Sequence, residues 1–244
     1  MLVREVVNYS SYWRSSTFSS TVEPTIYFLA FGFGFGSVVS RIGGFDTIDF
    51  IGTGVVATAV LFSSAFPAMF GTFVKYQFQR TYDAILAAPV DTEELVTAEA
   101  LWMATRAAVY GCVPMVVAIF FGLDPSWGMF AVPLICWLSG FGWACFGIAV
   151  AGFAKSFENF NYIVSAVLTP LFLLAGTFFP LDRWPEWLQA LANLNPLHHT
   201  VELVRDAVFD VEIWEDLARL GALVVFGLVI WRISIHAMTQ KLID

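Results

Sequence analysis

Charged side chains are scarce in this sequence and are absent from long stretches of it. Only 13% of the 244 residues are Asp, Glu, Lys or Arg, and 58% are hydrophobic, whereas soluble domains average about 25% charged residues. Residues 50–74, 125–154 and 159–181 contain no charge at all. Such runs exclude an ordinary soluble domain, because about 20 mostly apolar residues are enough for a helix to cross a bilayer.

The sequence also lacks the motifs of common catalytic sites. None of its three lysines follows a glycine, so the Gly-Lys-Ser or Gly-Lys-Thr end of a phosphate-binding P-loop is missing. Cys112, Cys136 and Cys145 have no C-x-x-C spacing and are typical of small buried hydrophobes. A net charge of −8 argues against nucleic-acid binding. We therefore expect a non-enzymatic chain without a metal or cofactor of its own.

The apolar runs predict six transmembrane helices. They are apolar on every face, whereas the strands of a membrane barrel alternate apolar and polar residues. We expect an all-α integral membrane fold with spans at about 20–40, 50–74, 98–122, 128–153, 159–181 and 217–238.

The distribution of basic residues predicts the orientation of these spans. Six spans leave both termini on one side, and cytoplasmic loops carry more Lys and Arg. With cytoplasmic termini, seven basic residues lie at the inner side and four at the outer side. The inner set is Arg4, Arg14, Lys75, Arg80, Lys155, Arg232 and Lys241, and the outer set is Arg41, Arg183, Arg205 and Arg219. We therefore expect both termini in the cytoplasm.

Three segments outside the spans are also expected to be helical. Residues 1–16 have the spacing of an amphipathic helix lying in the membrane interface, with a frayed terminus as the alternative. Glu23 and Pro24 are typical of a helix start and predict that the first span begins there, although Glu23 could instead gate substrate. Residues 78–89 predict a short helix closed by Pro89, and residues 183–209 predict two short outer or re-entrant helices.

Three segments of the chain resemble ABC-2 type permeases, in the branch of nodulation protein J. They are Glu23–Gly36 with its alternating Phe and Gly, the run QRTYDAILAAP at Gln79–Pro89, and Gly176–Pro185 continuing through Leu194–Leu197 to Arg205. These segments occur in the family's order, and the resemblance covers nearly the whole chain.

This resemblance implies the permease subunit of an ATP-driven exporter in a bacterial cytoplasmic membrane. Two copies of the permease would work with two separate ATPase subunits, which carry the ATP and Mg²⁺. The cargo would be a lipid-linked saccharide, a lipooligosaccharide, a polysaccharide or an amphiphilic drug. The resemblance also implies that residues 80–89 are a coupling helix docking on the ATPase, through Arg80, Thr81, Tyr82, Asp83, Ile85, Leu86 and Pro89.

The spacing of Tyr82, Ile85 and Leu86 places them on one helix face, which would stay wet on a solvated loop unless a partner covers it. We therefore expect that face to contact the ATPase.

Two features are candidates for the substrate path. Gly32 and Gly36 form a small-x-x-x-small pair within the run Phe31, Gly32, Phe33, Gly34, Phe35, Gly36, which suits either close helix packing within the chain or a path or dimer seam. Arg106 lies inside a span, where it could snorkel to the interface, pair with Glu99 or contact an anionic substrate.

Two other functions remain open at this point. A secondary transporter usually has ionisable residues near the bilayer midplane, and the interiors of these spans lack Asp, Glu and Lys. A membrane scaffold or sensor is the other alternative. A partner with a P-loop would favour the exporter over both.

Overall fold

The computed structural model describes residues 2–36, 38, 39, 41–181 and 184–243. Side chains are not described for Leu2, Val3, Tyr12, Ser19, Glu23, Phe35 and Ile243. The side chains of Glu23 and Phe35, to which roles were assigned from the sequence, therefore lie outside the described part. Asp182 and Arg183 of the third resembling segment lie outside it as well.

The described chain is mostly helical, which confirms the predicted class of fold. Its elements are α1 (Leu2–Gly36), β1 (Arg41–Ile42), β2 (Phe45–Asp46), α2 (Thr47–Gln77), α3 (Thr81–Leu86), α4 (Thr92–Phe120), η1 (Trp127–Ala131), α5 (Val132–Phe153), α6 (Glu158–Ile163), η2 (Val164–Leu168), α7 (Thr169–Leu173), α8 (Glu186–Asn193), α9 (Pro196–Val208) and α10 (Ile213–Ile243). Four segments of the described chain are long and apolar enough to span a membrane: α2, α4, η1 with α5, and α10.

Helix α2 lies at the centre of the bundle, between α1, α4, α5 and α9. Small residues let the central helices approach closely. A Cβ atom added at Gly147 of α5 would lie 2.4 Å from the carbonyl oxygen of Ala65, and one at Gly140 would lie 2.5 Å from the Cβ of Ala107. Lipid gives helices no hydrophobic drive to associate, so close backbone packing of this kind holds membrane bundles together.

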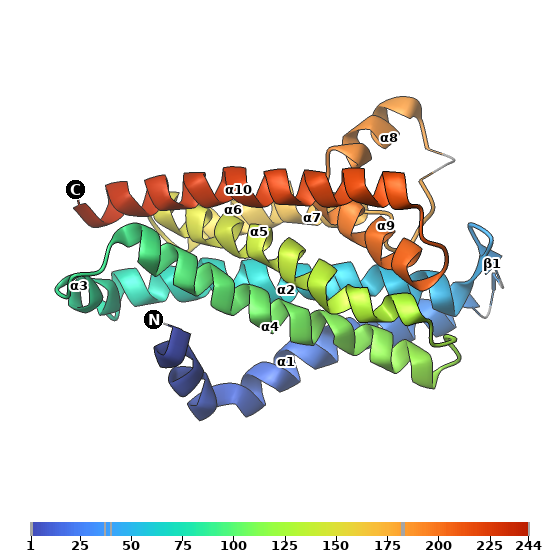
Figure 1. Cartoon of the computed structure of the whole chain (residues 1–244), viewed down its shortest axis with the longest axis horizontal. Coiled ribbons are helices and arrows are strands. Elements are labelled where there is room, and N and C mark those ends of the chain that lie inside the picture. The colour runs from blue at the N-terminus through green and yellow to red at the C-terminus, as the bar shows by residue number, and fades with distance from the viewer. Residues whose placement is uncertain (1, 37, 40, 182–183, 244) are drawn as a thin grey trace.

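Helix α1 is a single helix in which Pro24 is an interior residue. The prediction that a helix starts at Glu23 and Pro24 is therefore wrong, because α1 continues through the proline from the segment expected at the interface. Figure 1 shows that the first turns of α1 run at an angle to the remainder.

The segment from Glu158 to Leu173 is also helical but irregular. It consists of α6, the π-helical η2 and α7 in succession. Pro170 follows the π-helical part, and a proline cannot donate the backbone hydrogen bond that a regular helix requires. The expected helix at 159–181 extends too far, because the helical part ends at Leu173 and Gly176 adopts a positive φ of 82°.

The two ends of the bundle carry different elements. Figure 1 places both chain ends toward the end where α3 lies, and β1, β2 and α9 toward the opposite end. The β1–β2 hairpin was not predicted, although Gly43 and Gly44, which both have positive φ, supply the turn that two antiparallel strands need. We call the α3 end the inner end and the hairpin end the outer end.

Candidate functional site

Helix α3 is held at the inner end between α2 and α4, and Tyr82 anchors it. The Tyr82 side chain is buried, and its hydroxyl donates to Oε2 of Glu99 on α4 at 2.5 Å. Arg80, which precedes α3, adopts a left-handed conformation with φ of 51°, so the chain turns sharply between α2 and α3. The prediction that Tyr82 lies on the open, partner-facing surface is therefore wrong.

Glu99 also binds α2 and thereby ties three helices together. Lys75 Nζ of α2 donates to Glu99 Oε1 at 2.8 Å and to the two carboxylate oxygens of Glu5 at 3.2 and 3.3 Å. Arg4 Nη2 lies 2.5 Å from Glu5 Oε1 and 3.7 Å from Glu99 Oε1. The first turns of α1, the end of α2, α3 and the start of α4 thus share one polar cluster, which we call the inner network.

Burial and charge set the protonation of this network. Burial, with the Glu99 carboxylate beside it, holds the pKa of Tyr82 well above its ordinary value, so the hydroxyl stays a neutral donor. Burial alone would raise the pKa of Glu5, but Lys75 and Arg4 together bring it below its ordinary value. The network therefore works as a fixed set of charge-assisted hydrogen bonds that join four helices.

The other residues of the expected coupling helix differ in exposure. Ile85 is half-buried and packs with the apolar side chains around Tyr82, and Leu86 is also half-buried. The exposed residues of this segment are Arg80, Asp83, Ala84, Ala87, Ala88 and Pro89, whereas Thr81 is half-buried. Apart from Arg80 and Asp83, the exposed residues are small, so this surface could fit closely into a groove of another protein.

The Phe and Gly run lies in the second half of α1, toward the outer end. The ring of Phe31 lies 4.3 Å from that of Phe178, and the ring of Phe33 packs edge-on against Phe121 at 5.1 Å. A Cβ atom at Gly32 would make only ordinary contact with Phe28, and one at Gly34 would meet no described atom within 4 Å.

Close helix packing within the chain therefore does not explain Gly32 and Gly34. A Cβ atom at Gly36 would only approach Thr47 at 4.0 Å. Gly32, Phe33 and Gly36 line a pocket of about 590 Å³ with the start of α2. The tight contact is instead at Gly52 of α2, where an added Cβ would lie 2.8 Å from that of Ala118.

Arg106 is buried in the part of α4 near the inner end, with 7% of its surface exposed. Its Nη2 donates to Ser16 Oγ of α1 at 2.6 Å, and its guanidinium lies against the rings of Tyr9 and Tyr110. Among the described residues it forms no ion pair with Glu99, which contacts Lys75 and Tyr82 instead. The expected pairing with Glu99 is therefore wrong, whereas snorkelling to the membrane interface stays a prediction.

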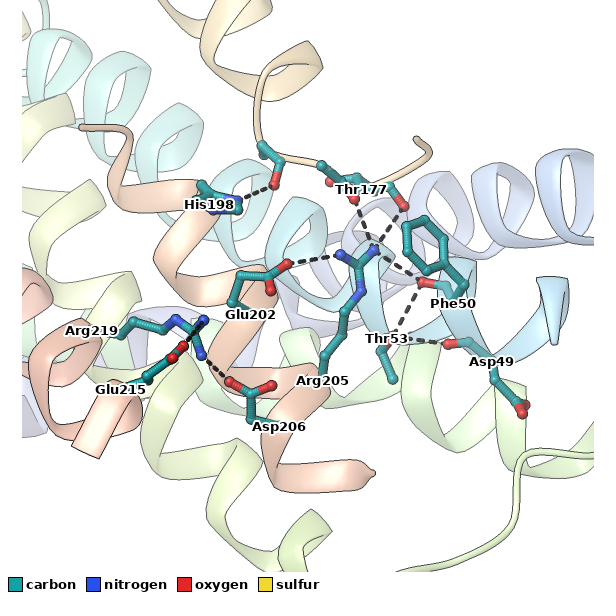
Figure 2. A network of polar contacts seen from close by, with 12 residues as sticks. Asp49, Phe50, Thr53, Thr177, His198, Glu202, Arg205, Asp206, Glu215 and Arg219 are labelled. Atoms are coloured by element: carbon teal, nitrogen blue, oxygen red, sulfur yellow. Dashed lines mark hydrogen bonds and ion pairs between the residues drawn. The ribbon is translucent and has the colours of Figure 1, made fainter. Parts of the chain in front are cut away.

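At the outer end, Arg205 of α9 joins three parts of the chain (Figure 2). Its Nη2 donates to the carbonyl oxygen of Gly176 at 2.8 Å, and its guanidinium lies 3.7 Å from the centre of the Phe50 ring at the start of α2. Its Nη1 donates to Glu202 Oε1 at 3.0 Å. This arrangement fixes α9 against α2 and against the turn that follows α7.

The same figure shows Arg219 of α10 between Asp206 and Glu215. Arg219 forms ion pairs with both of them and lies 3.7 Å from Asp216. One arginine therefore faces three carboxylates at this end. In the part of the chain that the structure describes, no three His, Cys, Asp or Glu side chains are grouped as metal ligands.

Sequence reasoning missed the inner network and Arg205. Lys75 and Glu99 lie at the ends of two predicted spans that flank a short helix, and these positions could have predicted that the two residues contact each other. Arg205 was expected as an outer basic residue at the end of the third resembling segment, and no local pattern links it to Gly176 or Phe50.

Comparisons with known proteins show which family this chain is similar to. The family described as ABC-2 type transporter matches residues 1–209. The chain is 30% identical over 238 residues to Nodulation protein J of Sinorhizobium fredii, an alignment covering 95% of this chain and 90% of that protein. It is 27% identical over 225 residues to the Inner membrane transport permease YadH of Escherichia coli K12, covering 91% and 87% of the two chains.

Proposed function

This chain belongs to the ABC-2 type transporter family, and we propose that it is the permease subunit of an ATP-driven exporter. In this proposal two copies of the chain bind two separate ATPase subunits, which supply ATP, Mg²⁺ and hydrolysis. The complex moves a lipid-linked saccharide, lipooligosaccharide, polysaccharide or amphiphilic drug out across the cytoplasmic membrane. The termini and α3 lie on the cytoplasmic side.

The placement of α3 is the observation that supports this proposal most. The helix stands at the inner end on the loop between α2 and α4, and the Tyr82 hydroxyl binds Glu99 of α4 at 2.5 Å. A force applied to its exposed side is therefore passed to both long helices and, through Lys75 and Glu5, to α1. A short helix fixed in this way is suited to carry the motion of an ATPase into the membrane bundle.

Purification from native membranes tests the proposal. The tagged full chain is extracted in mild detergent, its partners are identified by mass spectrometry, and ATP hydrolysis by the preparation is measured. We expect a P-loop ATPase in amounts close to those of the chain and hydrolysis that depends on it. A preparation without any P-loop protein would favour the secondary transporter or the scaffold and would overturn the proposal.

A further inference from the structure

A pocket of about 600 Å³ lies near the inner end, between α1, α2 and α4. Lys75 and Arg106 are the only charged residues among its described lining, and Ser15, Ser16 and Ser20 of α1 line it as well. The lining therefore combines positive charge with hydroxyl groups and has no described carboxylate.

No acidic residue among the described ones neutralises the positive charge of Arg106 at this pocket. The ammonium of Lys75 is bound by Glu5 and Glu99, whereas Arg106 has no acidic partner among the described residues. Its Nε is buried and forms no hydrogen bond with the described chain, and its Nη2 binds only the neutral Ser16 hydroxyl. Because burying a cation without a counterion is costly, an anion at Arg106 would offset that cost.

The remaining wall of the pocket is aromatic. Phe62, Phe66 and Phe70 repeat at four-residue spacing along α2 and line the pocket. Their ring centres follow one another at 5.0 and 6.5 Å. A stripe of this kind suits an apolar chain much better than it suits a small hydrated anion.

We propose that this pocket binds an anionic amphiphile, with a phosphate or carboxylate head at Arg106 and the apolar part along the stripe of Phe62, Phe66 and Phe70. The Ser16 and Ser20 hydroxyl groups add hydrogen bonds to the head. This inference rests on the proposed function and deepens it, since it assigns an anionic head to the cargo and places its binding site at the inner end.

Binding to the purified full chain in a neutral detergent tests the proposal without the ATPase. The probes are dioctanoyl phosphatidic acid, the uncharged dioctanoylglycerol and inorganic phosphate, and titration calorimetry gives each affinity. We expect phosphatidic acid to bind at least about tenfold more tightly than either of the others. Equal affinity for dioctanoylglycerol would overturn the anion site, and equal affinity for inorganic phosphate would overturn the role of the apolar stripe.

Three variants test whether the ligand binds in this pocket. Arg106→Gln removes the charge and should weaken binding of phosphatidic acid about tenfold or more. Gly71→Leu fills the pocket from α2, where an added Cβ meets no described atom within 4 Å, and should also weaken binding. Gly221→Leu on α10 is the matched control, because its surroundings are equally open and it does not line the pocket.

Unchanged affinity in Arg106→Gln and Gly71→Leu would overturn the proposal, as would an equal loss in Gly221→Leu. These results are independent of the proposed function. If no ATPase associates with the chain but phosphatidic acid still binds, the exporter proposal alone is overturned. If the chain exports in an ATP-dependent way but both pocket variants bind phosphatidic acid as the natural protein does, the pocket proposal alone is overturned.

Discussion

At the scale of single residues, Tyr82 and Glu99 determine how firmly α3 is attached to the bundle. Both side chains are buried, and Glu99 Oε2 accepts from the Tyr82 hydroxyl at 2.5 Å and from the Thr72 hydroxyl at 3.4 Å. A buried hydrogen bond to a charged group contributes about 1.5 to 3 kcal/mol, more than a contact at the surface.

We predict that Tyr82→Phe loosens α3 while the rest of the bundle stays intact. The variant keeps the ring but removes the donor to Glu99, so the opening of α3 should become more favourable by roughly 1 to 3 kcal/mol. Hydrogen exchange followed by mass spectrometry should show faster exchange in residues 81–87. Asp83→Asn is the control, because Asp83 is exposed and forms only a surface ion pair with Arg80. Unchanged exchange in Tyr82→Phe would contradict the anchoring role.

Asp206 at the outer end carries a pH dependence. Burial and the hydrogen bond with Asp216 raise its pKa to about 7, although Arg219 opposes the rise and Glu202 adds to it. In the unfolded chain a carboxyl group of this type titrates near its ordinary value of 3.8. The folded state therefore binds more protons between these values, so this residue's contribution to stability falls as pH rises from about 4 to 7.

We predict that Asp206→Asn removes this loss of stability at higher pH. The variant should match the natural protein most closely at about pH 4, where this loss begins, and exceed it by on the order of 1 to 2 kcal/mol at about pH 8, because the amide remains neutral. Thermal unfolding in detergent at the two pH values measures the difference. The exposed Asp210 provides the control variant Asp210→Asn. A variant less stable than the natural protein at the higher pH would show that the ion pair with Arg219 outweighs the burial of the carboxylate.

At the scale of elements, uninterrupted apolar runs predicted α2, α4, α5 and α10, because a span must satisfy its own backbone whatever its neighbours are. Helix bounds elsewhere depended on neighbours and were predicted poorly. Pro24 has the local chemistry of a helix start, but α1 continues through it. The helical part after Glu158 ends at Leu173, because Pro170 and Gly176 impose local irregularities that composition does not show.

Helix α3 shows the same limit for a functional site. The spacing of Tyr82, Ile85 and Leu86 predicted a shared apolar face, and it could not show which neighbour covers that face. In the structure the chain itself covers Tyr82 and much of Ile85. Contacts between distant helices, such as Arg106 with Ser16 or Arg205 with Gly176, leave no local pattern and could not be predicted.

We predict that Leu86→Asp weakens docking of the ATPase. Leu86 is only half-buried within the chain, and covering such a side chain with a partner is worth roughly 1.5 to 3 kcal/mol. The aspartate should lower co-purification of the ATPase at least about tenfold while membrane abundance stays normal. Ile85→Asp should lower abundance as well, because Ile85 packs within the inner end. Normal recovery of the ATPase with the Leu86→Asp variant would mean that this segment does not contact the ATPase.

At the scale of the whole molecule, the two ends are chemically distinct. The inner end holds the inner network and α3, and the outer end holds the hairpin, α9 and the excess of carboxylates around Arg219. Both chain ends lie toward the inner end (Figure 1), which is the arrangement that the predicted six spans would give. The excess of Lys and Arg on inner loops would place that end in the cytoplasm.

Thiol labelling in intact cells tests this orientation. Single cysteines at Asp46 and Glu212, in a chain whose Cys112, Cys136 and Cys145 have been replaced, should react with an impermeant reagent added outside. A cysteine at the exposed Asp83 of α3 should react only after the membrane is permeabilised. The reverse pattern would invert the topology, and with it the proposed side of the ATPase.

Assembly is the other property of the whole molecule that can be measured. The bundle is dense around α2, where 83% of the most apolar stretch is buried, whereas only 22% of the corresponding stretch of α10 is covered. Because the described part of the bundle is packed at its centre, we expect a passage for a large amphiphile to form at a surface shared with another copy. The second half of α1 provides one candidate surface, since a Cβ atom added at Gly34 would meet no described atom within 4 Å.

We therefore predict a particle with two permease and two ATPase chains. Native mass spectrometry of the complex in detergent should give this 2:2 mass, and Gly34→Trp should lower the share of the dimer, because a large side chain there would hold the second copy away. Gly221→Trp on α10 is the matched control, because an added Cβ at Gly221 also meets no described atom within 4 Å. A 1:1 particle that still exports its cargo would contradict the shared passage. A dimer unaffected by Gly34→Trp and broken by Gly221→Trp would move the seam from α1 to α10.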